Sequence, residues 1–131
     1  MRGWRRQTMN RSKPAAKSVD MKIVQEIFGN NQELLGRFFR DFMRNSPQIL
    51  SDIKIAVEAR DADGIRRHAH KLKGSLRYLA AEEAIACASA LEEIGRTGNL
   101  AAAQRAFENL VAAYEDVRRF ISEAQAVSTS T

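Results

Sequence analysis

Apolar side chains recur every three or four positions from about residue 19 to residue 121, the spacing that places them on one face of a helix. The first such segment predicts a short helix over 19–28, with Ser18 or Asp20 as its N-cap and Gly29 as the residue that ends it. Strands are not expected, because runs that alternate apolar and polar residues are few. The pattern therefore predicts an all-α protein.

A second and longer apolar pattern begins near Asn31 and continues through Val57. The pair Ser46-Pro47 interrupts it. Proline removes one donor from a helical hydrogen-bond ladder, yet it suits the first turn of a helix. This segment is therefore expected to be either one kinked helix or two successive helices.

Three further helices are expected. The turn RDADG, with Asp61 as N-cap, precedes a helix whose apolar residues continue to Leu79. A helix over about 82–95 carries small residues that permit close packing, and another follows the turn RTGN and runs through Ile121. Four long amphipathic helices joined by short turns predict an antiparallel four-helix bundle over 18–123, with a short extra N-terminal helix.

Charge is unevenly distributed along the 131 residues. The net charge is +5, but residues 1–17 contain six of the 21 basic residues and none of the 16 acidic ones, so the rest of the chain carries −1. We therefore expect a basic flexible tail or linker at 1–17 and a short flexible tail at 124–131. Because the body has no basic surplus, nucleic-acid binding is not expected.

Neither a membrane span nor a secretion signal is apparent in the sequence. No stretch approaches 18 consecutive apolar residues, and the basic N-terminus lacks the apolar core of a signal peptide. The lone Cys87 cannot form an internal disulfide, so nothing requires an oxidising compartment. A cytoplasmic protein without membrane insertion is expected.

The helix after Asp61 separates into two faces when its residues are placed about 100° apart. Its buried stripe is expected to consist of Ile65, Ala69, Leu72, Leu76 and Leu79. An exposed basic ridge is expected from His70 with Arg66, Lys73 and Arg77. Gly74 lies beside His70, opposite the stripe, whereas His68 falls on the shoulder of the stripe. The two histidines do not share a face, which argues against a joint metal site.

Gly74 is unusual at this position. Glycine in a helix interior is less favourable than alanine by roughly 1 kcal/mol. On the solvent side, packing within the chain does not explain the absence of a side chain. The sequence therefore suggests that a partner approaches the backbone closely beside His70.

Several other residues are interpreted as structural. His68 is expected to be half-buried in the bundle, and Cys87 to be a small buried residue. Phe38 and Phe39 are neighbours on one helix and cannot both point fully inward, so one of them is free to contact a partner.

The segment His70-Lys71-Leu72-Lys73-Gly74-Ser75 resembles the H-x-L-K-G-[SA] signature of histidine-containing phosphotransfer (Hpt) domains, the relay modules of multistep two-component signalling. The resemblance covers about 18–123 in helix order and length, and includes the Asp61 turn and the pair Leu91-Glu92. Two positions depart from the family pattern: Leu76 replaces a small residue, and Leu79-Ala80-Ala81 replaces Leu-Gly-Ala.

The resemblance implies that His70 accepts a phosphoryl group from a receiver-domain aspartate and passes it to another. A neutral imidazole is a competent nucleophile near neutral pH, and basic neighbours disfavour its protonated form. Lys73, Arg77 and Arg66 would then stabilise the phosphoryl group by charge-assisted contacts, while Gly74 admits the loops of the receiver.

The partners and cofactors follow from the same resemblance. The expected partner is the receiver domain of a hybrid sensor kinase, a response regulator, or both. The receiver supplies Mg²⁺, so this chain is expected to bind no cofactor of its own, to lack ATP-dependent kinase activity and to be monomeric. It would act as a free relay protein or as the C-terminal part of a membrane-anchored hybrid sensor kinase.

Other functions were weighed against this one. A catalytic kinase is disfavoured, because the chain has no Gly-rich nucleotide-binding loop. A sensor-kinase dimerisation helix would be expected to follow its histidine with glutamate rather than with Lys71. The main alternative is a helical adapter that docks a partner through the same basic face without being phosphorylated. Binding of nucleic acid through residues 1–17 is a third possibility.

Overall fold

The structure is a computed structural model that describes residues 19–130, with side-chain surroundings through residue 126. The basic segment 1–17 and the candidate cap Ser18 lie outside the described residues. The described part of the chain is helical and contains no strand, which confirms the all-α prediction. Its elements are α2 (Met21–Phe28), α3 (Gln32–Glu58), α4 (Ala62–Arg77), α5 (Glu82–Thr97), the 3₁₀ helix η3 (Leu100–Ala102) and α6 (Ala103–Ser130).

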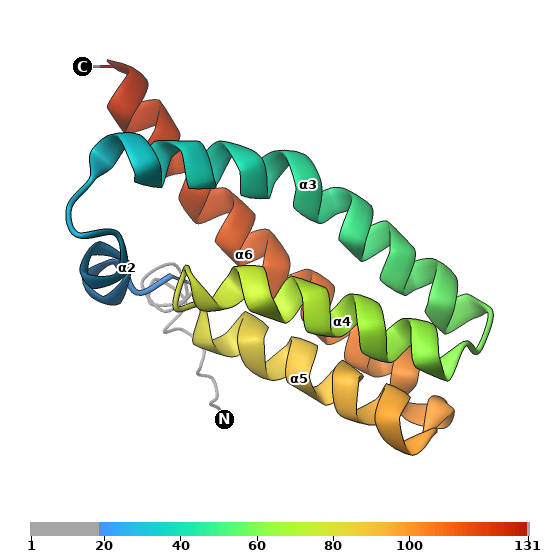
Figure 1. Cartoon of the computed structure of the whole chain (residues 1–131). Coiled ribbons are helices and arrows are strands. Elements are labelled where there is room, and N and C mark those ends of the chain that lie inside the picture. The colour runs from blue at the N-terminus through green and yellow to red at the C-terminus, as the bar shows by residue number, and fades with distance from the viewer. Residues whose placement is uncertain (1–18, 131) are drawn as a thin grey trace, which may run out of the picture.

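The four long helices form an antiparallel bundle, as predicted (Figure 1). Helix α4 packs against α3 on one side and against α5 on the other, while α6 packs against both α5 and α3. The short helix α2 lies at the end of the bundle where α4 finishes and α3 begins (Figure 1). Its start is tied to that end, because the Asp20 backbone N–H donates to the carbonyl oxygen of Leu79 at 3.3 Å.

Side-chain caps fix where three of the helices begin: Asp20 for α2, Asn31 for α3 and Asp61 for α4. The Asp20 carboxylate accepts from the backbone N–H groups of Lys22 and Ile23, so Asp20 is the N-cap of α2. Asp61 caps α4 by accepting from the Gly64 N–H at 3.0 Å, as the sequence predicted. Because these bonds satisfy donors that have no partner within the helix, each cap sets the register of the helix that follows.

Helix α3 is one continuous helix, so the possibility of two successive helices at Pro47 is wrong. The adjacent Ser46 is buried and links this region to α6. Its hydroxyl donates to the Phe42 carbonyl oxygen at 2.6 Å and lies 2.8 Å from the Tyr114 hydroxyl. Since a serine has one O–H donor, Tyr114 donates to Ser46 in this second bond. The bond joins α6 to α3 one residue before the proline.

The predicted stripe of α4 forms the centre of the core. Its five members are fully buried: Ile65, Ala69, Leu72, Leu76 and Leu79. Leu76, one of the departures from the family pattern, is thus accommodated by packing. His68 is half-buried, as expected. Cys87 was expected to be buried but is only half-buried; burial, and to a lesser extent the charge of Glu83, raises the pKa of its thiol.

Helices α4 and α5 approach each other closely at Gly95. A Cβ atom added there would lie 2.6 Å from both the Ala62 carbonyl oxygen and the Arg66 backbone nitrogen. Real Cβ atoms do not come so close to backbone atoms, so any other residue would push the two helices apart. Gly95 therefore sets the distance between α4 and α5 on the side where His70 lies.

The ends of α4 and α6 each show one further feature. Ala80, the second departure from the family pattern, has a φ of +49°, in the left-handed region that favours glycine. At the other end of the chain, α6 continues as a helix to Ser130, past residue 123, where the bundle was expected to stop. Ala124 packs against the core there, and this apolar contact supports the additional helical turn.

Candidate functional site

His70 projects from the middle of α4 into solvent. Its side chain is 64% exposed, and it lies away from the buried stripe of the same helix. The relay hypothesis requires this placement, because a phosphoryl donor must reach one ring nitrogen from outside. His68, two residues earlier, is turned toward the bundle and is only partly accessible.

A carboxylate from the neighbouring helix α5 contacts the ring of His70. The Nδ1 atom of His70 lies 2.8 Å from Oε2 of Glu92, and the other carboxylate oxygen of Glu92 lies 2.5 Å from Nζ of Lys73. Glu92 therefore bridges two residues of the α4 signature. It was absent from the predicted site residues, although the pair Leu91-Glu92 was noted as part of the family resemblance.

The proton at this contact can be placed. The hydrogen bond from Lys73 lowers the pKa of Glu92, with a smaller contribution from His70, and partial burial opposes both. Glu92 is consequently a carboxylate at neutral pH and can only accept hydrogen bonds. The Nδ1 atom of His70 is therefore the donor, and the lone pair of the neutral ring is on Nε2.

The predicted basic ridge is not uniform. Lys73 is only 13% exposed, because its ammonium group turns toward α5 and pairs with Glu92; its placement on an exposed ridge was wrong. Arg66 is partly exposed and pairs with Asp63 of the first turn of α4 at 2.8 Å. Arg77 is exposed, and no ion pair holds it within the described residues. The structure thus divides the four ridge residues into three that are held by carboxylates and one that is not.

Gly74 is exposed, and a Cβ atom added to it would meet no atom within 4 Å. Nothing inside the chain therefore requires glycine there, as the sequence argument expected. The open space at Gly74 adjoins a shallow groove. This groove is formed by the end of α4, by α2 and by the start of α3. The groove is lined by Ile27, Phe38, Lys71, Ser75, Arg77 and Tyr78 together with Gly74.

Two residues that line the groove, Phe38 and Tyr78, belong to an aromatic cluster. The Phe38 ring lies 5.5 Å from that of Phe28 and 5.6 Å from that of Tyr78, measured between ring centroids. Phe38 is partly exposed while Phe39 is buried in the core, so only one of these neighbours points fully inward, as predicted. Ile27 and Tyr78 are exposed large apolar side chains at the edge of the groove.

Comparison with known proteins identifies the family of the chain. The family model of the Hpt domain matches residues 37–120. The chain belongs to the Hpt domain family. A similar fold is seen in the crystal structure of histidine-containing phosphotransfer protein B from Pseudomonas aeruginosa PAO1. That structure superposes with a TM-score of 0.78, is 22% identical, and the match covers 83% of this chain and 95% of the other. None of the curated proteins matches the sequence.

Family membership decides the general role of the chain. It is a histidine phosphotransfer intermediate of phosphorelays, and Hpt domains interact with receiver domains in these relays. None of the helices described between residues 19 and 130 is long and apolar enough to cross a membrane.

Proposed function

We propose that His70 carries the phosphoryl group, on Nε2, between the aspartates of two receiver domains. The observation that carries this assignment is the contact between Nδ1 of the exposed His70 and the Glu92 carboxylate. In that contact Nδ1 carries the proton and donates a hydrogen bond to Glu92. The other ring nitrogen, Nε2, has the free lone pair and faces away from Glu92. His68 has no such carboxylate partner among the described residues, and the bundle partly covers its side chain.

The transfer step follows from this geometry. The lone pair on Nε2 attacks the phosphorus atom of a receiver aspartyl phosphate. The bond between phosphorus and the aspartate oxygen breaks, and its electron pair leaves with the aspartate carboxylate. The ring keeps its proton on Nδ1 and gains positive charge, which the adjacent Glu92 carboxylate offsets. Transfer to a second receiver reverses these steps, with the aspartate of that receiver as the nucleophile.

Three cations of α4 are assigned to the phosphoryl group: Lys73, Arg66 and Arg77. Each lies within about one or two helical turns of His70 on the same side of α4. Their charge-assisted contacts would stabilise the transferred group in both directions of flow. The Mg²⁺ that phosphoryl transfer needs would be held by the receiver, and this chain would bind no cofactor of its own.

The surface around Gly74 is assigned to the docking of the receiver. Gly74 leaves the main chain accessible beside His70, and the groove next to it offers an apolar surface with two cations, Lys71 and Arg77, at its margin. Apolar contacts would provide binding area, and the cations would favour the acidic active site of a receiver. One monomer of this chain would serve one receiver, of a hybrid sensor kinase or of a response regulator. We place the exchange in the cytoplasm.

The assignment is tested by labelling with a phosphorylated receiver. His70→Gln is expected to abolish transfer, because glutamine keeps the size and polarity of the side chain but has no nucleophilic nitrogen. His68→Gln is the matched control and is expected to retain labelling. Mass spectrometry of peptides kept at neutral or alkaline pH locates the phosphoryl group. Continued labelling of folded His70→Gln protein would overturn the assignment, and receiver binding without any labelling of the wild type would favour the adapter.

A further inference from the structure

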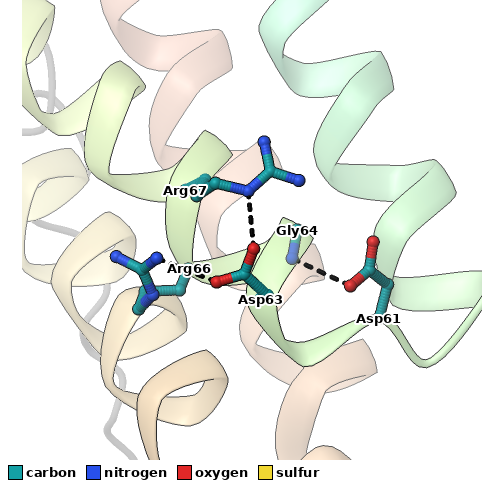
Figure 2. A network of polar contacts seen from close by, with 5 residues as sticks. All are labelled: Asp61, Asp63, Gly64, Arg66 and Arg67. Atoms are coloured by element: carbon teal, nitrogen blue, oxygen red, sulfur yellow. Dashed lines mark hydrogen bonds and ion pairs between the residues drawn. The ribbon is translucent and has the colours of Figure 1, made fainter.

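The first turn of α4 holds a carboxylate with two arginine partners (Figure 2). Oδ1 of Asp63 lies 2.8 Å from an Nη atom of Arg66, and its Oδ2 lies 2.8 Å from Nε of Arg67. Asp63 itself is exposed and makes no contribution to the core. The adjacent Asp61 has a different task, since it caps the helix through the Gly64 N–H (Figure 2).

Arg66 is placed between Asp63 and the proposed phosphoacceptor His70 on the same face of the helix. It lies three residues after Asp63 and four residues before His70. Residues at both of these separations are neighbours on a helix surface. The backbone of Arg66 is fixed against α5 at Gly95, while its side chain remains partly exposed. The guanidinium group is therefore able to reach either Asp63 or a phosphoryl group on His70 by a change of rotamer alone.

We propose that Asp63 binds Arg66 in the unphosphorylated protein and releases it to the phosphoryl group of phosphohistidine 70. This inference rests on the proposed function of His70. Asp63 is thus a positioning residue that acts through Arg66 and does not touch the reacting atoms. Arg67 also binds Asp63 and remains bound to it when Arg66 leaves. The carboxylate of Asp63 therefore keeps one cationic partner after the release of Arg66.

The relative strength of the two contacts supports the release. Ion pairs between exposed side chains contribute little to stability, typically less than about 1 kcal/mol. The planar guanidinium group binds two oxygens of a tetrahedral phosphoryl group with two parallel hydrogen bonds, and these bonds to a doubly charged group are among the stronger polar contacts. Arg66 therefore moves toward the phosphoryl group once that group is present, and returns to Asp63 after transfer.

Glu92 offers the same arrangement on the other side of His70. It binds Lys73 through one oxygen and the Nδ1 proton of His70 through the other. When Lys73 turns to the phosphoryl group, Glu92 still accepts the hydrogen bond from the Nδ1 proton of His70. Each carboxylate near the site thus has one partner that leaves and one that stays.

The experiment measures the titration of the phosphoryl group by ³¹P NMR. The protein is phosphorylated with phosphoramidate, which transfers its phosphoryl group to histidine and releases ammonia, so no receiver is needed. A His68→Gln background leaves His70 as the only histidine. Contact with Arg66 favours the dianion of the phosphoryl group and lowers the pH at which it titrates. Arg66→Ala is therefore expected to raise this midpoint by about half a pH unit.

Asp63→Asn is expected to lower the midpoint, because Arg66 is then no longer shared with a carboxylate. Removal of the negative charge of Asp63 would also lower the midpoint directly through space, without any part played by Arg66. The double variant distinguishes these two explanations. In an Arg66→Ala background, Asp63→Asn is expected to have no effect. Asp116→Asn is the matched control, since it breaks a similar exposed pair with Arg119, but on α6. It is expected to leave the midpoint unchanged.

The outcomes separate the two proposals. Absence of a phosphohistidine resonance that depends on His70 would overturn the proposed function. A normal resonance whose midpoint is unaffected by Arg66→Ala would overturn the inference about Asp63 and leave the function intact. If Asp63→Asn shifts the midpoint equally with and without Arg66, the inference about Asp63 is also overturned. Such a result would show that the charge of Asp63 acts on the phosphoryl group directly and not through Arg66. Circular dichroism melts establish that each variant is folded.

Discussion

Two glycines on neighbouring helices of the bundle have opposite surroundings. A Cβ atom at Gly95 of α5 would collide with the backbone of α4, whereas a Cβ atom at Gly74 of α4 would meet nothing within 4 Å. The first glycine is required by a contact inside the molecule. The second has no such internal reason, and its explanation must be sought in what approaches from outside.

The two positions act together on His70. Gly95 lies one turn after Glu92 on α5, and the close approach it permits is what allows the Glu92 carboxylate to reach Nδ1 of His70. Gly74 lies one turn after His70 on α4 and keeps the surface beside the ring open. The internal glycine thus determines the geometry of the site, and the exposed glycine determines access to it.

The largest effect is expected from Gly95→Ala. The added methyl group overlaps backbone atoms of Ala62 and Arg66, which cannot move as a flexible side chain would, so the free energy of unfolding should fall by about 1–3 kcal/mol or more. Gly74→Ala is the matched control, and alanine there should raise the stability by up to about 1 kcal/mol. Urea unfolding measures both. Equal effects of the two substitutions would show that the comparison is wrong.

Gly74→Leu tests access directly. The larger side chain should leave the fold intact, but it should obstruct a receiver with a steric penalty of about 1–3 kcal/mol, which corresponds to roughly thirtyfold slower transfer in mid-range. Labelling by phosphoramidate, a small donor, should be unchanged. The ratio of the two labelling rates is the measurement. A parallel loss with both donors would indicate damage to His70 and not obstruction of a partner.

Glu92→Gln separates the charge of this residue from its shape. The pKa of Glu92 is held below its ordinary value of 4.5, mainly by the hydrogen bond from Lys73. A carboxyl group whose pKa is lowered by folding stabilises the protein above the unfolded-state pKa, and this contribution is lost as the pH falls through the lower folded-state pKa. The stability difference between wild type and Glu92→Gln should therefore be larger at pH 7 than at pH 3.

Urea unfolding at the two pH values checks this expectation. Glu93→Gln provides a comparison on the same helix, because Glu93 is exposed and its pKa is likewise lowered by its partner Arg96. Solvent screens this exposed pair, so Glu93→Gln should show a pH dependence of the same sign but smaller size. The phosphotransfer rate of Glu92→Gln should also fall several-fold, since the positive charge on the ring loses its carboxylate partner. An unchanged rate would remove Glu92 from the mechanism while leaving its structural role.

The smallest effect on stability is expected at Ala80, a position where the backbone conformation favours glycine but the chain has alanine. Ala80 follows α4 with a φ of +49°, a conformation that is unfavourable for a residue with a Cβ atom. Ala80→Gly should therefore stabilise the protein, by about 0.5–1 kcal/mol after allowance for the greater freedom of glycine in the unfolded chain. Ala81→Gly is the control, because Ala81 is buried and has a φ of −86°. It should destabilise the protein.

The sequence predicted the helices well because each depends on its own residues. The stripe of α4 was identified from spacing alone, and Asp61 was placed as its cap from residue type and position. Continuation of α3 through Pro47 was left open, because a proline in a helical pattern allows either a continuous helix or a restart. The contact of Ser46 with Tyr114 beside this proline comes from a distant helix and is not visible in the sequence. The extension of α6 was missed for a similar reason, since its support comes from packing against the core.

The candidate site was predicted in part. The helical wheel placed His70 and Gly74 correctly in solvent, because both lie on the side of α4 opposite the core. The pair of Arg66 with Asp63 lies within α4 and could have been predicted from its i,i+3 spacing, but it was not. The wheel failed for Lys73, whose side chain turns to a carboxylate on α5. A wheel describes directions around one helix axis, but it does not show which charged groups a neighbouring helix presents.

By itself, the sequence determined the all-α bundle, the exposed histidine and the glycine beside it, since periodicity and local caps encode these features directly. Only the tertiary structure decided which ring nitrogen is free and that Lys73 is already paired with Glu92. Those properties depend on the separation of α4 and α5, which is set by the close backbone contact at Gly95. Hydrogen bonds form only over such short distances, so the chemistry of His70 is specified by a residue on another helix.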